Sequence, residues 1–359
     1  MGISYLIIIT LVCLLAEGLC LALSHINFAE KSIKRLKNLL AALILLVLGI
    51  LTIFRSVNVG TDTKVYVGLF ETLRDGIYLP EFSRWEIGFQ WLNIFLSLFS
   101  RNPQTIIIAT GFICYFLISI YLARHVENKL LFVVLFYALL FSNYTNIIRQ
   151  SIAGSILVFA YEQCKKRRNL KAILLTLIAM LFHKGTGVFL IYILIKRKKI
   201  TKKGALIVFL SILAISIFAA SFFIDVFIKL APQYEEYFVG ERVGTGGLGT
   251  TMNLMIVAVL LFMYYIPRKK VEKDRGVLWL FLFCASITAM AYVMNNFLRA
   301  ALVFYLPIMK ECCSSLPEKK LDNSVIEFFG VLILLAFFIV IIIFRPEWNT
   351  LYPYEFYTN

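Results

Sequence analysis

The chain has 359 residues, of which 60% are hydrophobic and only 16% charged, and its mean hydropathy is +0.84. A soluble domain is nearer to half apolar and a quarter charged. Many apolar runs reach the ~17–25 residues that a helix needs to cross a bilayer. The composition therefore predicts a polytopic integral membrane protein. It excludes a soluble enzyme, a nucleic-acid-binding module and a disulfide-stapled secreted domain.

The positive charge follows a topological pattern. The formal net charge is +15, and 25 of the 36 Lys and Arg residues fall in six short segments. These segments are Lys31 to Lys37, Arg124 to Lys129, Lys165 to Lys171, Lys196 to Lys203, Arg268 to Arg275 and Lys310 to Lys320. Basic loops stay in the cytoplasm, so the six segments predict which ends of the helices face inward. This accounts for the charge better than binding to nucleic acid.

The apolar runs predict an all-α bundle of about twelve transmembrane helices, forming a single transmembrane domain over residues 1–359. In chain order they cover Tyr5 to Leu23, Leu39 to Phe54, Thr105 to Ala123, Leu130 to Phe141, Ile147 to Tyr161, a broken hairpin of Leu170 to Phe182 and Val188 to Ile195, Ala205 to Phe223, Met252 to Ile266, Val277 to Met294, Phe297 to Met309 and Val325 to Phe344. Both termini are expected outside, with outer loops at 55–104 and 224–251.

One apolar segment in the first outer loop is too short to cross. Glu86 to Phe99 has 14 residues, and counting it as a span would place Lys165 to Lys171 outside. We therefore expect a re-entrant or interfacial helix on the outer face.

Isolated polar residues gather at the outer ends of these spans. They are Arg55 and Asp62 in the loop FRSVNVGTDTKVY, Glu86, then Asn146, Arg149 and Gln150 at the start of the fifth span, His183 and Lys184 at the hairpin turn, and Arg299 and Tyr305 in the eleventh span. The cationic excess suggests an anionic ligand, because arginine binds phosphate bidentately and keeps its charge at any working pH.

Structural alternatives exist for each of these residues. Arg55 can snorkel to lipid headgroups, and Asp62 and Glu86 can cap the helices that follow them. His183 can be an ordinary turn residue. Arg149 and Arg299 are harder to explain in this way, because an arginine within a span needs a partner or a water-filled cavity.

Metal-binding patterns are absent from the sequence. It contains no HExxH, CxxC or His cluster and no DxD pair, although Asp62 with Glu86 is not excluded as a cation site. We therefore expect no metal and no cofactor, with arginines neutralising the ligand instead.

Five strings, taken in order, resemble the EpsG-like branch of the Wzy-type polysaccharide polymerases. They are FRSVNVGTDTKVY, EIGFQWL, NIIRQSIA, FHKGTG and NNFLRAALVFYLP, and the tail TLYPYEFYTN is also similar. The similarity covers Arg55 onward. The sequence departs from many relatives at HKGTG, where they carry Ser or Thr directly after the histidine.

The resemblance implies an extracytoplasmic glycosyltransferase in the bacterial cytoplasmic membrane, with its active site facing the exterior. Such enzymes join repeat units carried on undecaprenyl pyrophosphate, and a chain-length regulator is an implied partner. Arg149 and Arg299, assisted by Arg55, are expected to neutralise the pyrophosphate. Glu86, Asp62 and His183 are all candidates for the general base. Gln150, Asn146, Lys184 and Tyr305 are expected to bind substrate.

Two other classes stay open. A lipid-linked oligosaccharide flippase also suits a dozen spans, but transporters tend to place polar sites near the midplane and to show repeated halves. Another outer-face transferase, such as an O-antigen ligase or a dolichol-type glycosyltransferase, also fits. The sequence leaves open the sugar, the linkage and whether the product is O-antigen, capsule or exopolysaccharide.

Overall fold

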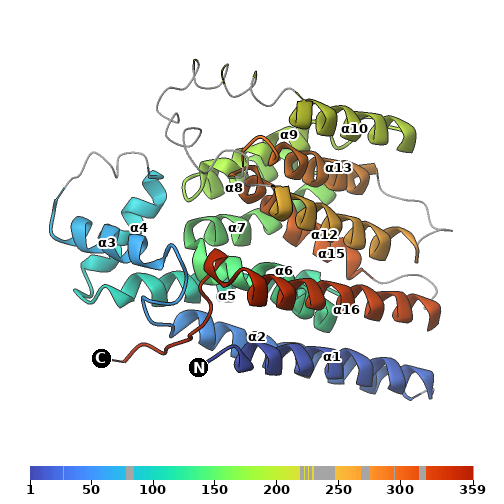
Figure 1. The fold of residues 1–359 in the computed structure, drawn as a ribbon, viewed down its shortest axis with the longest axis horizontal. Helices are drawn as coiled ribbons and strands as arrows, with labels where there is room; N and C mark the ends of the chain where they lie inside the picture. The colour runs from blue at the N-terminus through green and yellow to red at the C-terminus, as the bar shows by residue number, and fades with distance from the viewer. Residues whose placement is uncertain are drawn as a thin grey trace. The chain divides into compact units, whose positions relative to one another are not determined.

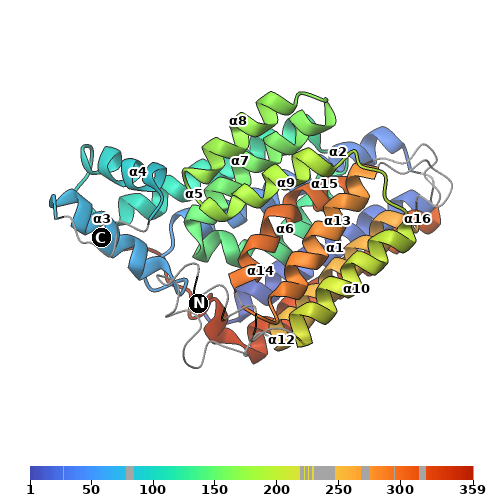
Figure 2. The same ribbon diagram turned by 90° about the horizontal axis from the view of Figure 1, so that it is seen from above.

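The computed structural model describes residues 1–26, 28–77, 85–218, 247–267, 275–294, 296–314 and 321–358, together with residues 222, 225 and 229. Throughout these residues the regular structure is helical, apart from an isolated antiparallel bridge between Arg55 and Phe356 (Figures 1 and 2). This confirms the all-α fold class. Most of the predicted outer loop 224–251 lies outside the described residues.

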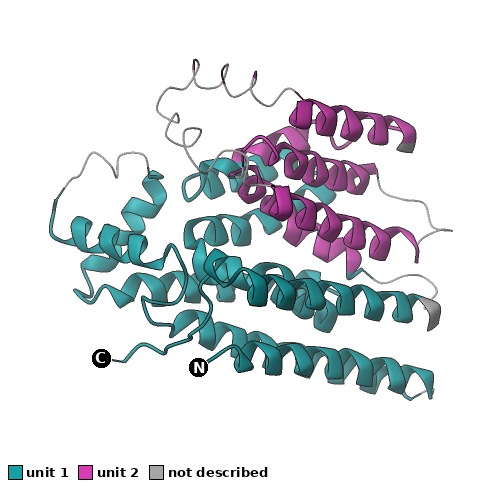
Figure 3. Cartoon of the chain, in the orientation of Figure 1, with its two compact units in different colours: residues 1–186, 313–359 teal, residues 187–312 magenta. Residues whose placement is uncertain are grey.

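The chain forms two compact units, shown in Figure 3. Unit 1 contains Met1–Thr186 and Cys313–Asn359, and unit 2 contains Gly187–Cys312.

Unit 1 is built around a helix that is apolar on all sides. Leu130 to Phe141 of α6 are all buried, as expected for a helix without a polar face. The helices of unit 1 are α1 (Ser4–His25), α2 (Glu30–Ile53), α3 (Thr63–Arg74), α4 (Ile87–Ser97), α5 (Gln104–His125), α6 (Lys129–Asn146), α7 (Ile148–Lys165), α8 (Asn169–Met180) and α16 (Leu321–Phe344), followed by the 3-10 turn η5 (Pro346–Trp348).

Unit 2 has an aromatic centre, in which the rings of Phe283 and Phe304 stack with centroids 5.7 Å apart. Its helices are α9 (Val188–Ile195), α10 (Lys202–Phe218), α12 (Gly247–Tyr265), α13 (Arg275–Met290), α14 (Asn296–Ala301), η4 (Leu302–Phe304) and α15 (Tyr305–Cys312). The predicted span Phe297 to Met309 is thus broken into three pieces. Pro307 has no N–H to donate one turn back, and the 3-10 turn lies just before it.

Several helices match membrane dimensions. Within the described part of the chain, α1, α2, α5, α6, α12 and residues Asn323–Phe344 of α16 are long and apolar enough to cross a bilayer. Four further helices are apolar but shorter. The protein is therefore multi-pass, whereas the count of twelve spans stays a prediction.

Segments predicted to be outside meet at one end of unit 1. The amide of Tyr354 donates to the carbonyl of Met1 (2.7 Å), and the amide of Tyr357 donates to the carbonyl of Phe54 (2.9 Å). At another point of the unit the amide of Asn128 donates to the carbonyl of Cys313 (3.2 Å), which joins two segments predicted to be cytoplasmic. These pairings agree with the predicted topology, while the sidedness itself stays a prediction.

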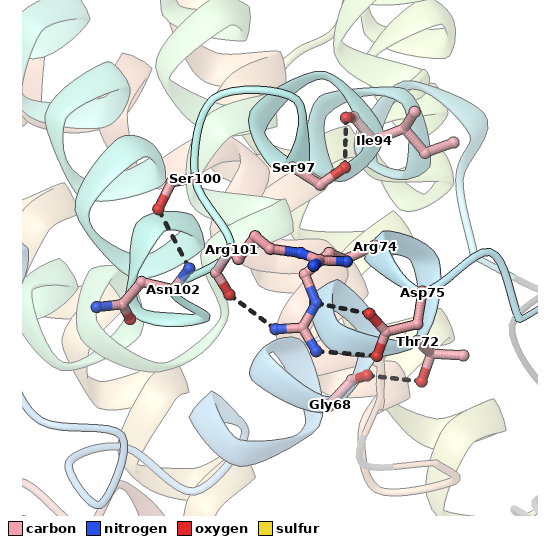
Figure 4. A network of polar contacts seen from close by, with 9 residues as sticks. All are labelled: Gly68, Thr72, Arg74, Asp75, Ile94, Ser97, Ser100, Arg101 and Asn102. Carbon is pink, nitrogen blue, oxygen red and sulfur yellow. Dashed lines mark hydrogen bonds and ion pairs between the residues drawn. The ribbon is translucent and has the colours of Figure 1, made fainter.

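The first outer loop contains two packed helices, α3 and α4, of which only the second was expected. Arg74 holds the end of α3 in place (Figure 4). The guanidinium of Arg74 donates to both carboxylate oxygens of Asp75, at 2.8 and 2.9 Å, and to the carbonyl of Arg101 at 2.7 Å. This ties the end of α3 to the connection that leads into α5.

Candidate active site

Glu86 is the centre of a charged cluster in unit 1. Its Oε2 accepts a hydrogen bond from Nη1 of Arg149. Its Oε1 accepts one from the backbone N–H of Lys184 at 3.0 Å and lies 3.6 Å from Nδ1 of His183. Only 6% of Glu86 is exposed. Three other predicted residues, from two separate segments of the sequence, are therefore brought together around the Glu86 carboxylate.

A close backbone approach builds this cluster. The amide of Gly88, in the first turn of α4, donates to the carbonyl of Leu181 at the end of α8 (2.9 Å). A Cβ at position 88 would lie 2.7 Å from that carbonyl oxygen and 2.8 Å from the Cβ of Leu181. Only glycine allows the start of α4 to contact the end of α8, and this contact brings Glu86 to His183.

Aromatic rings surround the guanidinium of Arg149. Its Cζ lies 4.4 Å from the ring centroid of Trp85 and 6.0 Å from that of Tyr66. Trp85, Tyr66 and Phe89 also contact one another edge to face or tilted, with centroids 5.6–5.9 Å apart. A cation over an aromatic face is stabilised by the ring quadrupole. Arg149 is thus held in place on one side by a carboxylate and on another by rings.

The electrostatics keep Glu86 ionised. Burial by itself would raise the pKa of Glu86, but the interactions with His183, Arg149 and the Lys184 N–H together lower the pKa of Glu86 to about 2. A carboxylate with so low a pKa is a weak base. Glu86 is therefore better suited to orienting His183 and Arg149 than to accepting a proton itself.

The second ring nitrogen of His183 faces a glycine. A Cβ at Gly185 would lie 2.8 Å from Nε2 of His183, so a larger residue there would crowd this atom. With Nδ1 beside the Glu86 carboxylate, the tautomer protonated on Nδ1 is favoured, and Nε2 is left as the proton acceptor.

A tight turn carries Asp62. Oδ1 of Asn146 accepts hydrogen bonds from the Thr61 hydroxyl (2.9 Å) and from the Asp62 amide (2.7 Å). Gly60 has φ +96°, and a Cβ there would lie 2.9 Å from the carbonyl oxygen of Thr145. Glycine is required at this position. Asn146 was predicted to bind substrate, but in this structure its side-chain oxygen fixes the backbone of the turn.

Capping through a side-chain hydrogen bond is wrong for both carboxylates, although the charge of Glu86 does lie at the N-terminus of α4. Asp62 and Glu86 do occupy the N-cap positions of α3 and α4, but neither side chain makes a capping hydrogen bond.

Arg55 is enclosed rather than open to a ligand. Its exposure is 0%, so the expectation that it snorkels to headgroups is wrong. Its Nη1 donates to the carbonyl of Thr52, while Nε and Nη2 are buried without a hydrogen-bond partner among the described residues. The backbone of Arg55 pairs with Phe356 of the C-terminal tail and accepts from Gln104 (2.6 Å). In this conformation Arg55 cannot contact pyrophosphate, because the residues around it leave no surface free.

A family model matches most of the chain. The EpsG family model matches residues 38–356, which include every residue of the Glu86 cluster. The chain belongs to the EpsG family. It is a membrane protein of polysaccharide biosynthesis. No curated protein and no solved structure matches it.

The remaining predicted site residues of this EpsG-family protein lie in different surroundings. Gln150 is buried on α7, next to Arg149. In unit 2, Tyr305 is buried and donates to Oδ1 of Asn253 (3.0 Å), and Arg299 is exposed on α14. The roles of Arg299 and Tyr305 stay predictions.

Among the residues that the structure describes, no group of three or more His, Cys, Asp and Glu side chains is placed to hold a metal ion.

Sequence reasoning missed three contributors to the site of this EpsG-family protein: Trp85, Tyr66 and Gly88. Trp85 directly precedes Glu86, and a ring beside a charged residue in an outer loop was the available signal. The requirement for Gly88 had no such signal, because it depends on a contact between α4 and α8.

Proposed function

We propose that this protein is an extracytoplasmic glycosyltransferase that polymerises oligosaccharide repeat units carried on undecaprenyl pyrophosphate. One observation carries the proposal: a single buried carboxylate holds an arginine and a histidine together. An arginine suits a pyrophosphate leaving group, and a histidine suits an acceptor hydroxyl. Both are needed for transfer of a sugar from a lipid carrier. We further propose that the site faces the exterior of a bacterial cytoplasmic membrane, with α4 immersed in the outer leaflet.

The acceptor side uses His183. The acceptor hydroxyl oxygen attacks the anomeric carbon of the lipid-linked chain, and Nε2 of His183 takes the hydroxyl proton. Glu86 remains ionised, fixes the tautomer through Nδ1 and stabilises the imidazolium that forms. Asp62 is half-buried on its turn, and its proposed role is to bind sugar hydroxyls of the substrate.

The leaving-group side uses Arg149 and Lys184. As the bond between the anomeric carbon and the pyrophosphate oxygen breaks, negative charge grows on the undecaprenyl pyrophosphate. Nε of Arg149 is buried and makes no hydrogen bond to any residue that the structure describes, so its N–H is an unused donor beside the cluster. The Lys184 side chain is exposed and makes no ion pair within the described residues. Arg299 is proposed to assist, and preorganised donors of this kind lower the barrier where charge develops.

The test is polymerisation of a synthetic lipid-linked repeat unit by purified protein in detergent. Detergent removes the two compartments that a flippase needs, so new glycosidic bonds support transfer over transport. A ligase would use the unit only once, so a ladder of products distinguishes a polymerase from a ligase.

His183→Gln probes the assignment within this assay. We expect it to lower kcat by ~10²–10⁴-fold, the usual contribution of a general base. His25→Gln is the matched control, because His25 is an exposed histidine in the last turn of α1. If His183→Gln forms polymer at the rate of His25→Gln, His183 is not the base.

A further inference from the structure

Two exposed apolar stripes meet beside the Glu86 cluster. On α4 the exposed large hydrophobic residues are Ile87, Trp91, Ile94 and Phe95, continued beyond the helix by Leu98 and Phe99. On α8 they are Leu170, Leu174, Leu177 and Ile178, continued by Leu181. Both sets follow the spacing i, i+4, i+7, i+8 and i+11, which marks one face of a helix.

The stripes converge where Gly88 contacts Leu181. Leu181 lies two residues before His183, and Gly88 lies two residues after Glu86. The side chains at the junction are therefore next to the cluster, while each stripe extends away from it along its own helix. We call the surface formed by Leu174, Ile178, Leu181, Ile87, Trp91 and Phe95 the apolar track.

The charge pattern of the track suits an amphiphile with an anionic head. Ile87 to Phe99 and Leu174 to Leu181 contain no charged residue, and exposed Lys171 lies one turn beyond the far end of the track on α8. At the junction, however, lie the Arg149 guanidinium and the exposed Lys184 side chain. A ligand with a phosphate head at the cluster and a hydrocarbon chain on the track matches both regions, because the track itself is uncharged and the cluster beside it is cationic.

Length favours a polyisoprenoid over an ordinary phospholipid. At 1.5 Å per residue, α8 with 12 residues and α4 with 11 residues are about 18 and 16 Å long. An acyl chain in one leaflet extends only ~15 Å, half of the hydrocarbon core. A chain that covers both stripes must be considerably longer than that.

We infer that the apolar track binds the isoprenoid chain of the lipid-linked substrate, with its pyrophosphate at the Glu86 cluster. This inference rests on the proposed function and names the part of the molecule that holds the carrier. Chain length then becomes a determinant of substrate recognition, because each isoprene unit in contact with the track removes apolar surface from its surroundings.

The test compares two carriers that bear the same pyrophosphate-linked repeat unit, one of farnesyl length and one of undecaprenyl length. In detergent we expect wild-type protein to prefer the long carrier by ~10-fold or more in kcat/KM, because two additional buried methylene groups already give about that factor. Trp91→Ala and Ile178→Ala should each reduce this preference several-fold. Leu15→Ala is the matched control, because Leu15 is exposed on α1 (71%) and lies in another lipid-facing surface.

Equal preference in Trp91→Ala, Ile178→Ala and Leu15→Ala would overturn the inference and make the track ordinary bilayer contact. A second measurement is independent of turnover. A photoreactive amino acid at position 178 should crosslink to undecaprenyl pyrophosphate, and one at position 15 should not. If wild-type protein polymerises neither carrier but position 178 crosslinks, the proposed reaction fails and the track stands. If polymer forms but crosslinking is equal at both positions, the track fails and the reaction stands.

Discussion

Unit 1 contains a second cluster made from similar residue types. There the hydroxyl of Tyr121 donates to Oε1 of Glu162 (2.8 Å), and Nδ1 of His125 lies 3.8 Å from Oε2 of the same carboxylate. Both clusters thus combine a buried glutamate, a histidine and aromatic rings, and both histidines are about one-fifth exposed. Residue types alone would not separate a catalytic cluster from a structural one.

The difference lies in the partners. Glu86 is bound by a guanidinium and a backbone N–H, and beside it lies an exposed Lys184 side chain that makes no ion pair within the described residues. Glu162 is bound by a phenol, and the ring of Tyr121 lies 5.3 Å from that of His125. The first arrangement holds fixed positive charge where an anion can approach, whereas the second satisfies a carboxylate within the helix bundle. Comparing matched changes at the two clusters is therefore the sharpest way to assign function.

The largest expected difference between the two clusters is the side of the membrane that each one faces. Asn58, near the Glu86 end, is exposed, and so is Lys166, which follows Glu162 at the end of α7. In a background without native cysteines, Asn58→Cys should react with a membrane-impermeant thiol reagent on intact cells, and Lys166→Cys only after lysis. Labelling of Lys166→Cys on intact cells would reverse the topology and place the proposed site inside.

The next largest effect is expected for Arg149→Lys. A lysine keeps the charge but loses the planar fork that binds both the carboxylate and a phosphate. We expect a loss of ~2–4 kcal/mol of transition-state stabilisation, comparable to removing one donor of a preorganised anion site. Single repeat units on the carrier should accumulate in the polymerisation assay. Arg299→Lys measures the contribution of the arginine in unit 2 in the same way. Wild-type chain lengths in both variants would show that these arginines only anchor the protein in the membrane.

A smaller effect is expected when Glu86 and Glu162 are each replaced by glutamine. Glu86→Gln removes the charge that orients Arg149 and His183, and a hydrogen bond to a charged group contributes about 1.5–3 kcal/mol. We expect kcat/KM to fall by ~10–100-fold in this variant. Glu162→Gln still accepts the Tyr121 hydroxyl, so its activity should stay within about two-fold of wild type. Equal losses of kcat/KM in both variants would indicate that each carboxylate only stabilises the fold.

The smallest effect concerns acid stability. The pKa of Glu86 is about 2 in the folded protein, below the value of about 4.3 expected when unfolded. Its ionisation therefore stabilises the fold fully above pH ~4.3, and this contribution is lost as the pH falls through ~4 towards ~2. Between pH 5 and 7 Glu86 should add no pH dependence. The melting temperature of wild type should exceed that of Glu86→Gln by a few °C near neutral pH, and this difference should disappear on acidification. A difference that grows in acid would contradict the ion pair.

The sequence predicted the limits of two long helices well, whereas α2 begins at Glu30, nine residues before the predicted Leu39, because the basic segment is part of the helix. The limits of α1 and α5 fall within about two residues of the predicted spans, because uninterrupted apolar runs bounded by polar residues determine them. Helix α3 was missed as an element, because its exposed polar face makes it resemble a loop. The break at Leu302–Phe304 was missed because a single proline has several possible effects on a helix.

The sequence identified the charged residues of the candidate site, but not which of them contact one another. Glu86, Arg149 and His183 were recognised because charges at the ends of apolar helices are costly. Their contact depends on the approach of Gly88 to Leu181, which lies almost a hundred positions along the chain, and no local pattern encodes it. The enclosure of Arg55 likewise depends on a tail almost three hundred residues away, so the same reasoning misplaced that arginine.

The tail that encloses Arg55 has a consequence for biogenesis. The hydroxyl of Tyr354 donates to the carbonyl of Leu51 (2.7 Å), and the amide of Ser56 donates to the carbonyl of Glu355 (2.9 Å). A ribosome makes residues 350–357 after every helix described here, so Arg55 emerges and enters the membrane long before its cover exists. The insertion machinery must therefore accommodate an uncovered guanidinium until residues 350–357 have been made. Assembly of this end of the protein therefore follows synthesis of the α-helices, and a nonsense codon just after α16 would leave every described α-helix in the chain with that step undone.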